Sequence, residues 1–112
     1  MNALEAAITP RTKAIILVTP SNPTGTVTPE STLKAVADLA NKHDLIVVAD
    51  EIYEHYVFDG HKHISLATLP GMRERTISLY SLSKGYALTG LRVGYIVAQP
   101  DLLQAIMPFT TP

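Results

Sequence analysis

The stretch "LIVVADE", residues 45–51, decides the fold. Five apolar residues stand in a row, and two acidic residues follow them. An uninterrupted apolar run of this kind, rich in β-branched side chains, is typical of a strand that is buried on both faces of a parallel sheet. The run "KAIILVT", residues 13–19, has a similar composition and is closed by the turn sequence "PSNPTG". The sequence therefore predicts two buried strands.

A helix is predicted between these strands, over residues 29–42. Its apolar residues recur at three- and four-residue spacing, which gives one apolar face. Thr28 is the expected N-cap, and Pro29 is expected at the first helical position. Strands joined by a helix run parallel, so this pattern favours an open α/β sheet with parallel strands.

The rest of the chain extends this sheet. Further strands are expected over residues 75–81 and 91–98, and a helix over residues 101–107. Residues 52–74 form a longer irregular connection with turn signals. In open α/β sheets, ligands gather at the carboxyl ends of the strands, so the polar residues at those ends are the first candidates for a site.

The composition of the chain argues against several classes of function. The chain has 112 residues, enough for one domain or a piece of one, and at 46% hydrophobic it is more apolar than a small soluble domain needs. Nine Lys and Arg residues against ten Asp and Glu residues, without a basic patch, argue against nucleic acid as a partner. The apolar runs are too short to cross a membrane. The absence of cysteine excludes a disulfide framework and fits a cytoplasmic protein.

Polar residues of a distinctive kind follow the predicted strands. An unpaired buried lysine is costly, so a lysine in an apolar stretch needs a reason. A desolvated lysine can become a nucleophile for a carbonyl, an aspartate can hold a heteroaromatic nitrogen protonated, and serine or arginine can bind phosphate. Together these groups meet the needs of pyridoxal phosphate. The residues concerned are Asn22, Asp50, Ser81, Ser83, Lys84 and Arg92.

Three segments carry a family resemblance. "SNPTG" (21–25), "DEIYEHYVFDG" (50–60) and "SLSKGYALTGLRVG" (81–94) resemble the signature segments of class I/II aminotransferases, which are fold-type I pyridoxal-phosphate enzymes. The second segment resembles the aspartate/alanine/aromatic-type subgroup. The resemblance covers essentially the whole chain. It implies that residues 1–112 are part of the large, cofactor-binding domain, with an N-terminal part and a C-terminal small domain missing.

The resemblance also implies strand order and residue roles. The first three strands would be parallel neighbours, with a terminal antiparallel strand beside the third, and a cis peptide would precede Pro23. Lys84 would be the catalytic residue, forming a Schiff base with pyridoxal phosphate and moving a proton between the substrate Cα and the cofactor. The other implied cofactor contacts are Asn22 and Tyr53 to the 3′-oxygen, Asp50 to the pyridine nitrogen, and Ser81, Ser83 and Arg92 to the phosphate.

The implied activity is transfer of an amino group from an amino acid to a 2-oxo acid, in a homodimeric full-length enzyme. Other readings stay open. A β-lyase, a decarboxylase or a cyclopropane-carboxylate synthase would share these motifs. So would the aminotransferase-like sensor domain of a transcription regulator, or a fragment without activity of its own.

Several polar and aromatic residues receive no functional role. Glu51 is interpreted as part of a turn, and Tyr56 and Tyr80 as aromatics of the core or the sheet edge. The pair His61 and His63 lacks a third obvious metal ligand, so we expect a solvated loop there and no metal site.

Overall fold

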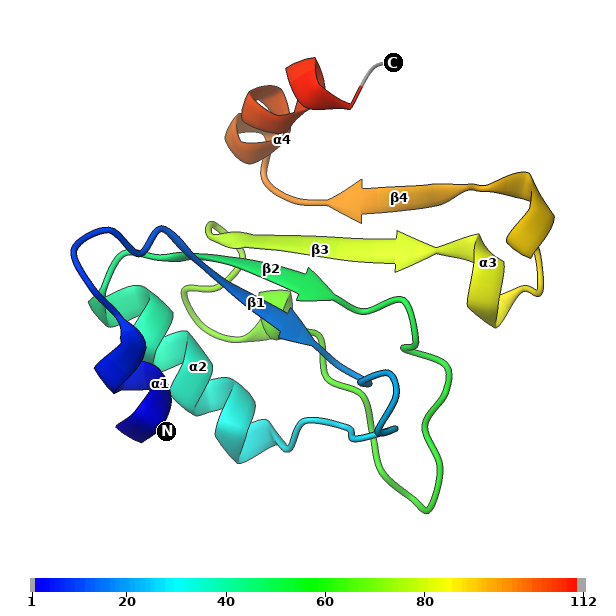
Figure 1. The fold of residues 1–112 in the computed structure, drawn as a ribbon, viewed down its shortest axis with the longest axis horizontal. Helices are drawn as coiled ribbons and strands as arrows, with labels where there is room; N and C mark the ends of the chain where they lie inside the picture. Colours follow the sequence, from blue (N-terminus) through cyan, green and yellow to red (C-terminus); the bar gives the residue numbers. More distant parts are fainter. Residues whose placement is uncertain (1, 111–112) are drawn as a thin grey trace.

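The computed structural model describes residues 2–110 and forms one mixed sheet with short helices around it (Figure 1). The strands are β1 (Ala14–Val18), β2 (Ile46–Asp50), β3 (Thr76–Ser81) and β4 (Gly94–Val97). The α-helices are α1 (Asn2–Ala7), α2 (Glu30–Lys42), α3 (Leu82–Gly85) and α4 (Pro100–Ile106). Three single turns of 3₁₀-helix are η1 (Leu66–Thr68), η2 (Thr89–Leu91) and η3 (Met107–Phe109).

The order of the strands is β1-β2-β3-β4. β1 and β2 pair in parallel, as do β2 and β3, while β3 and β4 are antiparallel. The register places Asp50 opposite Val18 on one side and opposite Leu79 on the other. Both the predicted fold class and the predicted strand order are therefore confirmed.

The core lies between the sheet and α2. Leu33 and Ala40 of the helix are fully buried, as are Val47 and Ala49 of β2. These residues belong to the apolar face of the helix and to one face of the central strand, so burying them together removes both surfaces from water. α1 adds Leu4 to the same core. Both helices thus cover the same side of the sheet (Figure 1).

The second face of the sheet differs from the prediction. We expected β1 and β2 to be buried on both faces, but the side chain of Ile16 in β1 is 74% exposed and that of Val18 is 38% exposed. The reason is that α1 and α2 pack on the other side, and within residues 2–110 no helix packs over Ile16.

The start of α2 also differs by one residue. Pro29, in extended conformation, is the N-cap, and its carbonyl accepts a hydrogen bond from the Leu33 amide at 3.0 Å. The Thr28 amide instead donates to the Thr19 hydroxyl oxygen at 3.0 Å. Thr28 is therefore tied to the end of β1, and the prediction that it caps the helix is wrong.

The last strand is shorter than the predicted range 91–98. Leu91 belongs to η2, and Arg92 adopts a left-handed conformation with φ 52°, so strand geometry begins only at Gly94. A Cβ on Gly94 would lie 2.7 Å from the Tyr80 carbonyl oxygen, so glycine permits β4 to approach β3 this closely.

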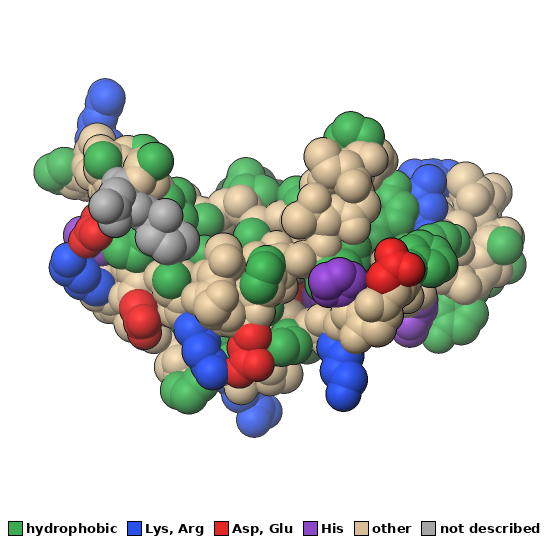
Figure 2. Space-filling view, turned by 90° about the horizontal axis from the view of Figure 1, so that it is seen from below, with side chains coloured by type: hydrophobic (Ala, Val, Ile, Leu, Met, Phe, Trp, Pro, Cys, Tyr) green, Lys and Arg blue, Asp and Glu red, His purple; other side chains and the backbone are tan. Residues whose placement is uncertain are grey.

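The surface carries no strong charge of one sign on the face in Figure 2, where basic and acidic side chains are interspersed. Among the described residues, no helix has the length and apolar character needed to cross a bilayer.

Candidate functional site

The predicted site residues gather at one edge of the sheet. β1, β2 and β3 all point toward the end where α3 lies (Figure 1). Asn22 follows β1, Asp50 is the last residue of β2, and Ser81 ends β3 directly before α3. Parallel pairing brings the carboxyl ends of these strands to the same edge, as is typical of ligand sites in α/β sheets.

Tyr53 is the centre of the closest group. The Asn22 side-chain amide donates a hydrogen bond to the Tyr53 hydroxyl at 3.1 Å. The Lys84 Nζ lies 5.8 Å from the centre of the Tyr53 ring, within the range of a cation–π contact. Tyr53 therefore contacts side chains from two other segments of the chain.

Lys84 is exposed at this edge rather than buried. Its position is nevertheless fixed through its backbone. The Tyr56 hydroxyl donates to the Lys84 carbonyl oxygen at 2.9 Å, and the Tyr56 ring packs edge-on against Tyr53 at 5.9 Å. Sequence reasoning gave Tyr56 no role in the site. The signal was the three-residue spacing of the tyrosines, since a turn joins the Tyr56 amide to the Tyr53 carbonyl at 2.8 Å.

A cavity of about 290 Å³ adjoins this group. It has both apolar rings and polar groups in its wall, a composition that suits a small-molecule ligand. The tight turn after β1 forms one wall, with a cis peptide between Asn22 and Pro23, as expected, and a second one between Thr19 and Pro20. The residues that line it are Pro20, Ser21, Asn22, Pro23, Gly25, Tyr53, Tyr56 and Phe58.

Ser81 and Ser83 form the junction between β3 and α3. Ser81 is the N-cap of the helix, and its hydroxyl oxygen accepts a hydrogen bond from the Ser83 amide at 3.1 Å. Ser83 is buried, and its carbonyl accepts from the Thr89 hydroxyl at 3.1 Å. These bonds fix the turn that carries Lys84.

Asp50 and Arg92 make hydrogen bonds with residues outside the group around Tyr53. The Asp50 carboxylate accepts a hydrogen bond from the Ile52 amide at 3.2 Å. The Arg92 guanidinium is exposed and donates to the Thr89 carbonyl at 3.2 Å. Among the described residues, neither side chain hydrogen-bonds to another predicted site residue. Their roles, like those of the other predicted site residues, stay predictions.

Comparison with known proteins identifies the family. The family described as aminotransferase class I and II matches residues 1–112. The chain belongs to the class I and II aminotransferases. An arginine–pyruvate transaminase from Pseudomonas aeruginosa is 51% identical over 97 residues, which are 87% of this chain and 24% of that protein. An aspartate aminotransferase from Pyrococcus abyssi is 43% identical over 109 residues, 97% of this chain and 28% of that protein.

A solved structure supports the same conclusion. The N-succinyldiaminopimelate aminotransferase from Mycobacterium tuberculosis has a TM-score of 0.94 and 41% identity, over 96% of this chain and 28% of that one. This aminotransferase chain thus spans 24% to 28% of the length of these relatives.

Glu51 is a further residue that the sequence left without a role. Its side chain is fully buried, and the Tyr80 hydroxyl donates to its carboxylate at 2.6 Å. The Leu66 amide donates to the other carboxylate oxygen at 3.2 Å. The His63 Nε2 lies 3.5 Å from the oxygen that accepts from Tyr80. Burial works to raise the pKa of Glu51, but the polar groups of His63, Tyr80 and Ser65 outweigh it and hold the pKa below its usual value.

The expected solvated loop at His61 and His63 is therefore only half correct. His61 is exposed, but the side chain of His63 is only 11% exposed. The reason is that Ile64 packs against the core and Leu66 is fully buried, so the chain at His63 already runs inward. Within residues 2–110, no three His, Asp or Glu side chains form a group that could hold a metal ion.

Tyr80 gives a pH-dependent prediction. Burial, together with its bond to Glu51, raises the pKa of Tyr80 to about 12 from an ordinary value of about 10. The folded protein keeps this proton where the unfolded protein loses it, so the resulting stability is present below about pH 10 and is lost as pH rises toward about 12. The measurement is the urea concentration at the midpoint of unfolding of the full-length protein. Over this pH range, that concentration should fall less in the Tyr80→Phe variant than in the wild type. Tyr86→Phe, at an exposed ring, is the matched control and should follow the wild type. Equal losses in all three proteins would contradict the prediction.

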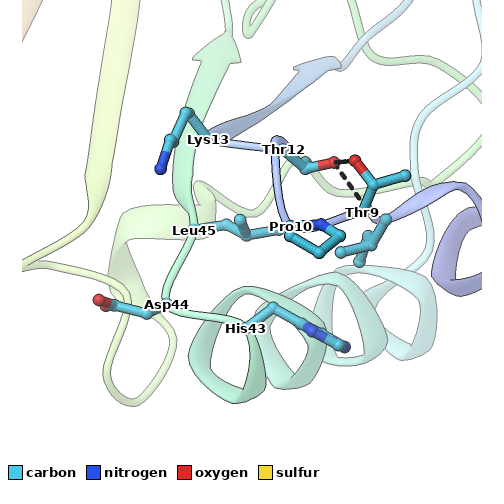
Figure 3. A pocket seen from close by; sticks show the side chains of 8 residues that line it. Thr9, Pro10, Thr12, Lys13, His43, Asp44 and Leu45 are labelled. Atoms are coloured by element: carbon cyan, nitrogen blue, oxygen red, sulfur yellow. Dashed lines mark hydrogen bonds between the residues drawn. The ribbon is translucent and has the colours of Figure 1, made fainter.

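Another cavity of about 470 Å³ lies at the opposite edge of the sheet, before β1 and β2 (Figure 3). Three of the polar side chains in its wall already have partners. The Thr9 and Thr12 hydroxyls lie 3.4 Å apart within hydrogen-bonding distance, and the Asp44 carboxylate accepts from Arg75 at 3.1 Å. This cavity is also remote from the strand ends that carry the predicted site, so it is not the candidate.

Proposed function

We propose that the full-length protein is a pyridoxal-phosphate-dependent aminotransferase, and that residues 1–112 are the central part of its large, cofactor-binding domain. The observation that carries the proposal is the meeting of Asn22, Tyr53 and Lys84 at the carboxyl ends of the strands. The aminotransferase names of the relatives support it independently.

The side chains at this edge fit pyridoxal phosphate in their chemistry. The amide of Asn22 and the hydroxyl of Tyr53 are adjacent hydrogen-bonding groups that suit a phenolic oxygen. The amine of Lys84 is exposed beside them and free to reach an aldehyde. When bound, the cofactor supplies that aldehyde and an electron-withdrawing ring.

Each residue then has a defined task. Lys84 would hold the cofactor through Nζ, and this amine, once released by the substrate, would move a proton from the substrate Cα to the cofactor. Asn22 and Tyr53 orient the ring, and Asp50 holds a proton on the ring nitrogen. Ser81, Ser83 and Arg92 bind the phosphate. In the structure the Arg92 guanidinium uses one nitrogen, Nη1, to donate to the Thr89 carbonyl.

Amino transfer is favoured over the other reactions because the relatives are transaminases, whereas a lyase or a regulatory sensor domain finds no support among them. Their names differ in substrate: aspartate, kynurenine and oxoglutarate, arginine and pyruvate. We therefore propose an amino acid and a 2-oxo acid as the substrate class. A homodimer in the cytoplasm is proposed on the family resemblance alone.

Trapping of the cofactor tests this proposal. The full-length protein is incubated with pyridoxal phosphate, reduced with borohydride, digested and mapped by mass spectrometry. We expect one dominant label, on the peptide that contains Lys84, and its loss in Lys84→Ala. Lys62→Ala, at an exposed lysine, is the matched control and should keep the label. A label that is spread over surface lysines and is unchanged in Lys84→Ala would contradict the proposal.

A separate assay tests the reaction. We expect the full-length protein to convert an added 2-oxo acid into its amino acid when a second amino acid is supplied. Release of ammonia or carbon dioxide without amino transfer would instead support the lyase or decarboxylase alternative.

A further inference from the structure

Glu51 stands next to a predicted site residue but turns away from the site. Asp50 is half-buried at the end of β2, whereas the side chain of Glu51 is fully buried on the face of the sheet that also buries Val47 and Ala49. Alternation along the strand accounts for this placement, since residues two apart point to the same face. A fully buried carboxylate is costly unless its oxygens are hydrogen-bonded, so its partners show what the residue does.

Those partners join segments that are far apart in the sequence. Tyr80, in β3, makes the shortest bond at 2.6 Å, and Leu66, in η1, donates its amide at 3.2 Å. The His63 Nε2 lies 3.5 Å from the carboxylate, an ion pair only when His63 is protonated, and it makes no hydrogen bond there. The Glu51 amide also donates to the Leu79 carbonyl at 3.0 Å. Side chain and backbone of Glu51 therefore both hold the end of β2 to the end of β3.

The connection continues to β4. The Tyr80 ring stacks on the Tyr95 ring, with centres 5.0 Å apart and planes inclined by 19°. Tyr95 is the residue opposite Tyr80 in the antiparallel ladder. One chain of side-chain contacts, from Glu51 through Tyr80 to Tyr95, thus links the end of β2, which carries Asp50, to β3, which carries Ser81, and to β4, which begins two residues after Arg92.

We propose that Glu51 is a positioning residue for the cofactor site, acting through its hydrogen bond to Tyr80. This bond fixes the end of β2 relative to the end of β3, and so fixes Asp50 relative to the turn that carries Lys84. The inference rests on the proposed function. A buried charge is a poor way to add stability compared with apolar packing, whereas a short charge-assisted bond is directional and sets geometry.

The test is a double-mutant cycle in the full-length protein. The variants are Glu51→Gln, Tyr80→Phe and the double variant, and Tyr80→Phe retains the ring that stacks on Tyr95. We measure the Kd for pyridoxal phosphate by absorbance titration, and the pH midpoint of the bound cofactor's absorbance band. Each single variant should weaken binding by about tenfold, the effect of losing either the charge or the donor of one charge-assisted hydrogen bond, and should shift the pH midpoint. The double variant should also lose about tenfold rather than about a hundredfold, because glutamine removes the charge and phenylalanine the donor of the same bond.

The control is Glu54→Gln, which neutralises a neighbouring carboxylate that is 29% exposed and not bonded to Tyr80. It should bind with the wild-type Kd. All titrations are made at a temperature at which circular dichroism shows each variant folded, so a role in stability alone would leave Kd and the pH midpoint unchanged. Should Tyr80→Phe fail to fold, the comparison of Glu51→Gln with Glu54→Gln decides the matter.

The outcomes separate the two proposals. Wild-type Kd and pH midpoint in a folded Glu51→Gln variant, with the cofactor still trapped on Lys84, would overturn the positioning role and leave the proposed function intact. Additive losses in the double variant would also overturn it. Absence of cofactor on Lys84 in the wild type would overturn the proposed function, and the positioning role with it.

Discussion

Asp50→Asn is expected to slow amino transfer by the full-length protein by about 10²–10³-fold, the effect of removing one preorganised electrostatic group from a reacting centre. In the proposed site, the negative charge of Asp50 keeps a proton on the ring nitrogen and so favours removal of the substrate proton by Lys84. Asparagine has the same shape but no charge. Lys84 still attaches the cofactor in this variant, so trapping on Lys84 should persist while turnover falls.

The choice of asparagine separates charge from local structure. In the structure, the Asp50 carboxylate accepts a hydrogen bond from the Ile52 amide, which stabilises the turn after β2. The asparagine oxygen can accept the same bond, so a turn-forming role would leave activity near the wild-type value in Asp50→Asn and reduce it only in Asp50→Ala. Asp38→Asn, on the exposed side of α2, is the matched control and should not change turnover. Near-wild-type turnover in Asp50→Asn would refute the proposed charge role.

The strands and α2 could be predicted because their signals are local. An unbroken apolar run marks β2, and apolar residues at three- and four-residue spacing mark α2. Strand ends followed by polar residues then placed Asp50, Ser81 and Lys84 at one edge of the sheet. The family resemblance added the antiparallel position of β4, which the chain confirms.

The Glu51–Tyr80 bond could not be predicted in the same way, because it joins residues 29 positions apart. A partial signal was present. Glu51 follows Val47 and Ala49 at two-residue spacing, so it continues the buried face of β2, but only the register of β2 against β3 brings Tyr80 to that face. The register depends on how the whole sheet pairs, so the sequence of either strand alone does not predict it.

Two further differences have separate physical causes. The apolar sequence of β1 indicated burial on both faces, yet Ile16 is exposed. An apolar sequence shows that a strand can be buried, but it does not show which segment covers each face. The predicted phosphate contact of Arg92 came from the family resemblance. The left-handed backbone of Arg92 and its bond to Thr89 belong to the η2 turn, a feature that spacing does not encode.

The second large effect is expected in the core. Leu33→Ala should lower the free energy of unfolding by about 2–5 kcal/mol, since it removes a fully buried side chain and leaves a cavity. Small domains are stable by only about 5–15 kcal/mol, so this loss is a large fraction of the total. Leu33 packs in the cluster that holds α2 against Ile15 of β1 and Val47 of β2. Urea unfolding followed by circular dichroism measures the change.

Lys34→Ala is the matched control on the same helix. Its side chain is 60% exposed and pairs with Glu30 at 2.6 Å, a pair four residues apart that contributes about 0.3–0.5 kcal/mol. Equal losses in the two variants would mean that α2 is not held by its apolar face. In that case the pairing of β1 with β2 alone, without support from α2, would bring the turn with Asn22 and the strand end with Asp50 together.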